Sequence, residues 1–201
     1  TILSQFEKKG KWEKERMTWM EWVQKIDFAV LDWIQQHIKG DFLDFLMPLI
    51  TALGNGGIFF GLLAVFLLCR KKYRRAGIAL LGGLTFCLIF GNLLLKPLVA
   101  RIRPYDLMEG IELLIKPLKD YSFPSGHTMA SFACASVFWH YRDIFKKWSI
   151  VALILAFCVA FSRLYLYVHF PTDVLCGGLL GWLFGWVAYR IADRVRLKKT
   201  V

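Results

Sequence analysis

The sequence predicts an all-α membrane protein, a polytopic bundle of five to six transmembrane helices with an N-terminal amphipathic helix in the membrane interface. Hydrophobic residues make up 57% of the 201 positions, which is more than a water-soluble domain of this length can bury. Several apolar runs reach the ~20 residues that a helix needs to cross a bilayer. Eight tryptophans suit a chain with long membrane–water boundaries.

Residues 17–53 are predicted to lie at the membrane surface as interfacial or re-entrant helices. Residues 1–16 are polar, and Met17 is a candidate start, which would make that segment an addition to the native protein. Met17–Ile38 mixes tryptophan and aliphatic residues with charged ones, as interfacial helices do. The charged residues are Glu21, Lys25, Asp27 and Asp32. Phe42–Leu53 is ~18 Å long as a helix, too short to span alone, but a sixth crossing there is the alternative.

Residues 54–192 are predicted to form the transmembrane core, and residues 193–201 a basic cytoplasmic tail. The predicted crossings are Thr51–Cys69, Ala76–Leu95, Ser125–Tyr141, Trp148–Val168 and Pro171–Ile191. Gly54, Gly56 and Gly57 are expected to break or bend the first crossing near its outer end. Glycines at 177, 181 and 185 of the last crossing predict close approach of a neighbouring helix.

The basic residues that give the net charge of +11 predict the topology. They cluster at 70–75, 142–147 and 190–199, after alternate crossings, so all three clusters share one side. By the positive-inside rule that side, with the C-terminus, is cytoplasmic. This predicts a multi-pass protein of the inner or plasma membrane whose loop 96–124 and turn at His169 face outward. Clusters beside apolar runs argue against a nucleic-acid partner.

Three polar clusters fall on the predicted outer side, where buried polar groups indicate function because they are costly in a membrane. The first contains Lys96 and Arg103, which share a face if one helix carries both, and Pro104 is expected to end that helix. Two cations aimed the same way can hold a phosphoryl group. The alternative is contact with lipid head groups.

The second cluster, Pro124-Ser125-Gly126-His127, opens a predicted membrane helix. The free N–H groups of a helix start form an anion site. Gly126 permits close approach, Ser125 adds a hydroxyl donor and His127 adds a titratable group. The alternative is a capped helix with an interfacial histidine.

The third cluster runs from Ser162 to Asp173. Arg163 lies inside an apolar run, where it needs an anionic partner. Asp173 falls in the first turn of the helix that begins at Pro171, where its carboxylate can accept a bond from His169. An imidazole oriented by a carboxylate is typical of a nucleophile or a base.

The order Lys-x6-Arg-Pro, Pro-Ser-Gly-His and Ser-Arg-x5-His-x3-Asp resembles the three-part signature of the type-2 phosphatidic acid phosphatase superfamily. The resemblance covers about Asp41 to Asp193. It implies a helical bundle with the motifs gathered at one end, and a lipid phosphatase that uses no cofactor.

The resemblance also implies a role for each matched residue. His169 would attack phosphorus, Asp173 would orient it, and His127 would protonate the leaving oxygen and then activate water. The residues expected to hold the phosphate oxygens are Lys96, Arg103, Ser125, Gly126 and Arg163. No metal is expected, because the acidic residues of the outer loop are scattered and the five cysteines lack metal-ligand spacing.

A lipid phosphate is the expected substrate, and the small size and outward-facing site resemble bacterial undecaprenyl diphosphate phosphatases. Phosphatidate, phosphatidylglycerophosphate and a soluble phosphate are the alternatives. The membrane spans argue against a haloperoxidase. A non-enzymatic lipid-phosphate binding or transport protein would not need two histidines and an oriented aspartate. The loop 105–123 is expected to cover the site and influence the choice of substrate.

Overall fold

Helices form the regular structure of the described residues, which are 19–108 and 110–194 of the computed structural model. The long elements are α2 (Trp19–His37), α3 (Asp41–Ala52), α4 (Ile58–Cys69), α5 (Arg74–Phe86), α7 (Gly126–His140), α9 (Lys147–Tyr165) and α10 (Pro171–Arg194). The short elements are η2 (Asn55–Gly57), the π-helical η3 (Cys87–Leu95), α6 (Lys96–Val99), η4 (Pro104–Asp106) and α8 (Arg142–Phe145). The all-helical prediction is confirmed.

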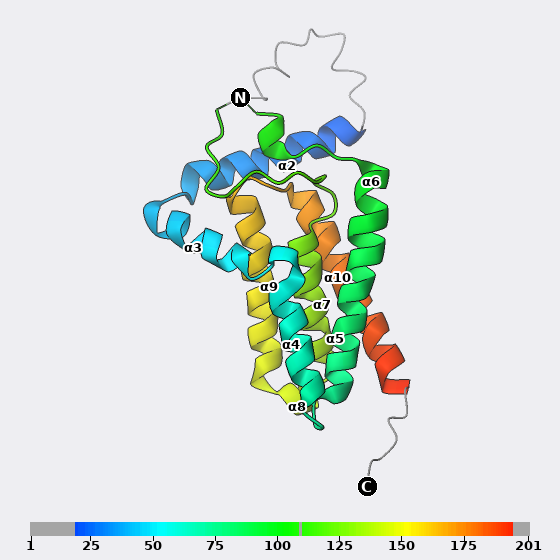
Figure 1. Ribbon diagram of the computed structural model, residues 1–201. Helices are drawn as coiled ribbons and strands as arrows, with labels where there is room; N and C mark the ends of the chain where they lie inside the picture. Colours follow the sequence, from blue (N-terminus) through cyan, green and yellow to red (C-terminus); the bar gives the residue numbers. More distant parts are fainter. Residues whose placement is uncertain (1–18, 109, 195–201) are drawn as a thin grey trace.

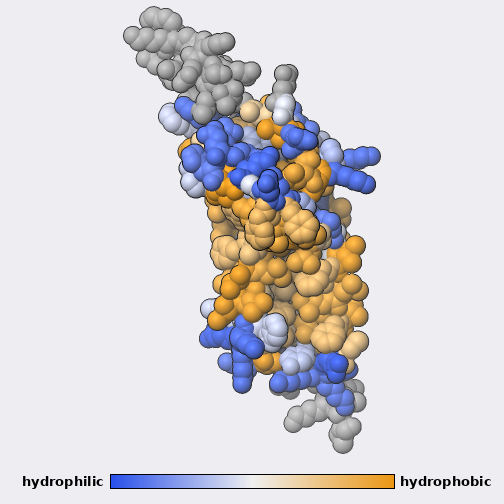
Figure 2. All heavy atoms as spheres, turned by 90° about the vertical axis from the view of Figure 1, so that its left-hand side faces the viewer, coloured by the Kyte–Doolittle hydropathy of each residue, from blue (hydrophilic) through white to orange (hydrophobic). Residues whose placement is uncertain are grey.

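The helices form a lengthwise bundle with α2 and α3 placed at one end (Figure 1). An apolar band covers the middle of the bundle and lies between two hydrophilic ends (Figure 2). Among the described residues, four helices are long and apolar enough to cross a membrane: Asp41–Cys69, Arg74–Asp106, Lys147–Tyr165 and Pro171–Arg194. The protein is therefore a membrane protein.

The glycine break predicted in the first crossing is present. Gly56 and Gly57 have φ angles of 58° and 68°, a left-handed conformation that glycine adopts without strain. This break separates α3, which lies at an angle to the bundle, from α4, which runs along it (Figure 1). The N-terminal end of α4 therefore meets the bundle at a glycine-rich turn.

The helix predicted as the crossing Ser125–Tyr141 is shorter than the four spans. It is α7, with 15 residues, or ~22 Å, and most of its side chains are buried. Helices α5, α9 and α10 all pack against it. Because α7 is enclosed by protein, its length need not match the bilayer thickness.

Helix α10 packs directly on α7 through its glycines at 177, 181 and 185, as their spacing predicted. These three residues are called the glycine stripe. A Cβ atom at Gly181 would lie 2.3 Å from the Met129 carbonyl oxygen, and one at Gly185 would lie 2.5 Å from that of Ala133. The same contact aligns the two helix starts, where the Ser125 N–H donates to the Asp173 carbonyl at 3.2 Å. The second and third motifs are thus brought together by backbone packing.

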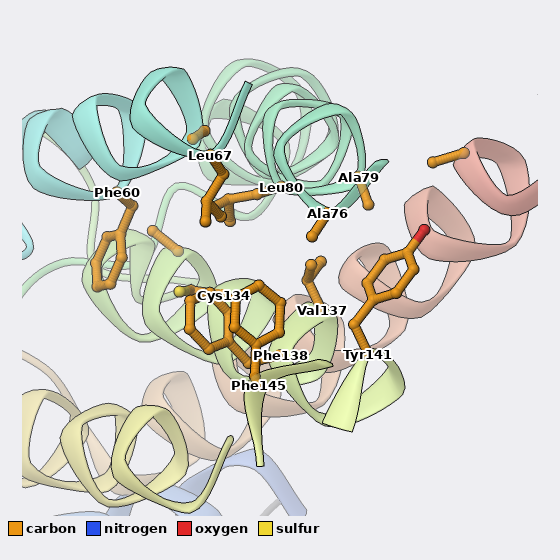
Figure 3. Packing of buried hydrophobic residues seen from close by; sticks show 13 residues of the cluster. Phe60, Leu67, Ala76, Ala79, Leu80, Cys134, Val137, Phe138, Tyr141 and Phe145 are labelled. Atoms are coloured by element: carbon orange, nitrogen blue, oxygen red, sulfur yellow. The ribbon is translucent and has the colours of Figure 1, made fainter. Parts of the chain in front are cut away.

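A buried cluster of aromatic and aliphatic residues (Figure 3) extends to α8, at the end of the bundle opposite to α2 (Figure 1). The rings of Phe138 and Phe145 stack with centroids 4.0 Å apart, and Leu67 and Leu80 belong to the same buried cluster. The turns at 70–75 and 142–147 and the end of α10 all lie at this end (Figure 1). The alternation of basic clusters predicted this shared side.

One local prediction is wrong: Lys96 and Arg103 are not on one helix. Helix α6 ends at Val99, Ala100 has a φ of 49°, and Arg103 is extended. Pro104 disfavours a helical conformation at Arg103. The left-handed Ala100 ends α6 before Arg103 is reached, as in a common C-terminal cap. The two cations meet through the loop that follows.

Candidate active site

Two residues from distant motifs, Arg103 and His169, are in contact at the α2 end of the bundle. The Arg103 Nη1 atom lies 3.2 Å from His169 Nε2 and donates to the Val168 carbonyl at 2.7 Å. Its Nε atom donates to the Asp120 carbonyl at 2.8 Å. Both side chains are buried, so the loops after α6 and α9 are fixed to each other.

These contacts define the tautomer of His169. Arginine only donates hydrogen bonds, so His169 Nε2 must carry a lone pair and the ring proton must be on Nδ1. The Nδ1 atom lies 3.3 Å from the Ser122 hydroxyl, which donates to Asp173 Oδ2. The direct distance from Nδ1 to Asp173 Oδ2 is 3.7 Å, longer than a hydrogen bond. The expected link to Asp173 therefore runs through Ser122, which the sequence analysis missed.

His169 is held in its neutral form. Burial lowers the pKa of this imidazole well below its usual 6.5, and the positive charges of Arg103, Arg163 and Lys96 lower it further. A neutral ring whose Nε2 atom carries a lone pair is the form that can attack phosphorus.

Arg163 is a buried guanidinium that forms no ion pair with the residues that the structure describes. It is 1% exposed, and its Nη1 atom donates to the Thr51 hydroxyl. Within the described residues, its Nε and Nη2 atoms have no hydrogen-bond partner. Leaving buried charged donors unpaired is costly, so this side chain is suited to bind an anion.

Lys96 and Arg103 share the carboxylate of Asp120. Lys96 Nζ contacts Asp120 Oδ2, and Arg103 Nη2 lies 2.7 Å from Oδ1. Burial alone would raise the pKa of Asp120, but the hydrogen bond from Lys96 and the two positive charges hold it at about 2. This carboxylate is therefore ionised at neutral pH and occupies cations that a phosphate would need.

Asp120→Asn is expected to strengthen the binding of orthovanadate, a phosphate analogue. The amide no longer competes as an anion for Lys96, while Arg103 keeps its backbone acceptors, Val168 and Tyr121. We expect the half-inhibiting vanadate concentration to fall about fivefold, since one charge-assisted contact is worth ~1 kcal/mol or more. A rise would show that Asp120 holds the cations in place instead of competing for them.

His127 is placed by the glycine break between α3 and α4. Its Nε2 atom lies 2.9 Å from Asn55 Oδ1, and a Cβ atom at Gly54 would lie 2.5 Å from the His127 ring. The charges of Arg163 and Lys96 act on His127, as they do on His169. The two histidines and the cations therefore lie within electrostatic reach of one another.

The start of α7 lies against the π-helical turn η3. A Cβ atom at Gly126 would lie 2.9 Å from Asn92 Oδ1, so a larger residue there would displace the Asn92 side chain. The Ser125 hydroxyl is buried and accepts a bond from Thr128 at 2.9 Å, which leaves its own proton free to donate. Asn92 is one helical turn before Lys96, and π-helical turns are frequent at functional sites.

A cavity of about 440 Å³ joins this polar region to apolar helix surfaces. Its polar lining includes Asn92, Lys96, Asp120 and His127. Its apolar lining comes from α4, α5 and η3 and includes Leu81, Leu84 and Leu88. The cavity can therefore accommodate a molecule with an anionic head and an apolar chain.

The segment between α6 and α7 packs over this end of the bundle. Tyr105 and Leu113 pack against a buried cluster that contains Ile34 of α2 and Met47 of α3. The Tyr105 hydroxyl also donates to the Leu118 carbonyl at 2.8 Å.

In the described part of the chain, no group of three or more His, Cys, Asp and Glu side chains could hold a metal ion.

The comparisons identify the family that this site belongs to. Residues 76–197 match the PAP2 superfamily. An undecaprenyl-diphosphatase from Sulfolobus acidocaldarius is 30% identical over 158 residues, 78% of this chain and 74% of that protein. Phosphatidylglycerophosphatase B from Bacillus subtilis is 30% identical over 165 residues, 76% of this chain and 70% of that protein.

A solved structure agrees with these matches. The crystal structure of a transmembrane PAP2-type phosphatidylglycerolphosphate phosphatase from Bacillus subtilis superposes with a TM-score of 0.71 and 26% identity, covering 88% of this chain and 89% of that one. The fold and the site define a membrane-embedded phosphatase. The chain belongs to the PAP2 superfamily of lipid phosphatases.

Proposed function

We propose that this enzyme hydrolyses undecaprenyl diphosphate at the extracytoplasmic face of the membrane, without a metal and through a phosphohistidine. The observation that carries this proposal is the buried guanidinium of Arg163, which has two unpaired nitrogens among the described residues and whose charge acts on a neutral His169. A buried cation is stable only with an anionic partner, and a phosphoryl group bound there would lie beside the nucleophile.

In the first step, His169 Nε2 attacks the terminal phosphorus and the bond to the bridging oxygen breaks. His127, protonated next to the anionic substrate, gives its proton to that leaving oxygen. Lys96, Arg103 and Arg163 balance the charge on the three equatorial oxygens, which is the main requirement of phosphoryl transfer.

In the second step, neutral His127 takes a proton from water, and the resulting nucleophile attacks the phosphorus of phosphohistidine. The phosphorus–nitrogen bond breaks, inorganic phosphate leaves, and His169 returns to its neutral form. The hydroxyl of Ser122 and the carboxylate of Asp173 stabilise the positive imidazole between the two steps.

The polyprenyl diphosphate is favoured by two observations. The cavity continues from Lys96 and Asn92 onto apolar side chains of α5 and η3, as a long lipid chain requires. A relative that covers most of this chain is named undecaprenyl-diphosphatase. Phosphatidylglycerophosphate is the second candidate, because another relative of similar identity is named for it.

The test is phosphate release by the purified protein in detergent from undecaprenyl diphosphate, phosphatidylglycerophosphate, phosphatidate and a sugar phosphate. We expect the highest kcat/KM with the polyprenyl diphosphate, inhibition by orthovanadate and full activity in EDTA. Loss of activity in EDTA would contradict the metal-independent mechanism. A higher kcat/KM with phosphatidylglycerophosphate would replace the proposed substrate with the second candidate.

A further inference from the structure

Asp173 is tied to the N-terminal helix by a chain of buried charges. Arg101 donates from Nη1 to Asp173 Oδ1 at 2.6 Å and from Nη2 to Asp27 Oδ2 at 2.6 Å. Asp27 and Asp173 are 1% and 0% exposed, so solvent and salt screen these ion pairs weakly. The phosphate-binding and proton-transfer steps described above use neither Arg101 nor Asp27.

The Asp27 carboxylate also caps α10, the helix that carries Asp173. Asp27 accepts from the Thr172 N–H at 3.0 Å and from the Thr172 hydroxyl at 2.6 Å. That hydroxyl in turn accepts from Arg101 Nη1 at 2.7 Å, and the Arg101 guanidinium lies 3.9 Å from the centre of the Phe170 ring. A carboxylate at a helix N-terminus is stabilising. Helix α2, which lies across this end of the bundle (Figure 1), thereby fixes the first turn of α10.

We propose that Asp27 and Arg101 are positioning residues for the histidine nucleophile, which makes α2 part of the catalytic apparatus. The inference rests on the proposed phosphohistidine mechanism. Asp27, Arg101 and Asp173 together carry one net negative charge. That charge matches the single positive charge that His169 gains when its Nε2 atom bonds to phosphorus. Without the charge of Asp27 the chain would be neutral, and the cationic imidazole would lose stabilisation in a weakly screened site.

The test is Asp27→Asn in the full-length protein purified in detergent. We expect kcat to fall about tenfold, the size typical of residues that orient a catalytic group from behind. KM and the half-inhibiting orthovanadate concentration should stay unchanged, because Asp27 and Arg101 do not contact the proposed phosphate site. A purely structural defect would alter all three quantities.

Asp32→Asn is the matched control, because it removes the same charge from the same helix. Asp32 accepts from the Tyr167 hydroxyl at 2.9 Å, so it also contacts the loop of the third motif but lies outside the Asp27–Arg101–Asp173 chain. We expect its kcat to equal that of the wild type. Thr172→Val provides a second variant that removes only the bridging hydroxyl, and it should lower kcat about threefold.

Two results would overturn the inference. One is that Asp27→Asn has the same kcat as Asp32→Asn. If Asp27→Asn does not fold, the same comparison is made with Thr172→Val. The other is a change in vanadate affinity with kcat unaltered. Failure of the mechanism itself would be recognised separately, because His169→Ala would then keep its activity.

Discussion

His169→Ala is expected to lower kcat at least ~10³-fold, as removal of a covalent nucleophile does, while the protein stays folded. The imidazole is buried where the loops after α6 and α9 meet, but the bundle itself is held by helix packing elsewhere. The measurement is phosphate release per enzyme, alongside the helical content and the melting temperature in detergent.

His140→Ala is the control for this variant. His140 lies at the opposite end of α7, where its Nδ1 atom contacts the Ser136 carbonyl at 2.7 Å, far from the proposed site along the helix. We expect its turnover to match the wild type. Retained turnover in His169→Ala would overturn the nucleophile assignment.

Arg163→Met is expected to abolish activity and stabilise the ligand-free protein at the same time. Turnover should fall ~10²–10³-fold, because a group that balances charge in the transition state is lost. The melting temperature without ligand should rise, because an apolar side chain replaces a buried charge whose Nε and Nη2 atoms have no partner in the described part of the chain. Orthovanadate should no longer raise the melting temperature.

Arg101→Met is expected to have the opposite effect on the melting temperature. It removes a guanidinium that is paired with two buried carboxylates, Asp27 and Asp173, so it should lower the melting temperature. An equal destabilisation by Arg163→Met and Arg101→Met would contradict the view that Arg163 is held for an anionic ligand.

The fold could be predicted largely from hydrophobic periodicity, composition and glycine spacing. Apolar runs predicted the long helices, and the glycine stripe of α10 predicted its close packing on α7. The sequence could not reveal that α7 is enclosed, because an apolar run reads alike whether lipid or protein covers it. Nor could it show that Ala100 would end α6, since a single left-handed residue depends on the tertiary contacts of the following loop.

The motif residues could be identified in advance because charged groups in apolar surroundings are conspicuous. His169 and Arg103 are brought into contact in the structure, and His127 lies within electrostatic reach of the same cations. Their roles in catalysis stay predictions.

The supporting residues were missed for a different reason. Asp27 looked like one more charge on an amphipathic helix, and Ser122 like a loop serine. Asp27 matters because it contacts Arg101, about 75 positions away in sequence. Ser122 matters because it contacts Asp173, about 50 positions away. Asn92 offered a usable signal, since it is a polar residue in an apolar run one turn from Lys96.

The covalent intermediate is the most direct test of the whole account. The substrate would be undecaprenyl diphosphate labelled in its terminal phosphate, mixed with His127→Ala enzyme and quenched in alkali. In this variant the good leaving group still permits attack, but no base activates water, so the account predicts acid-labile label on the peptide that contains His169. Label on another residue, or none despite turnover, would contradict it.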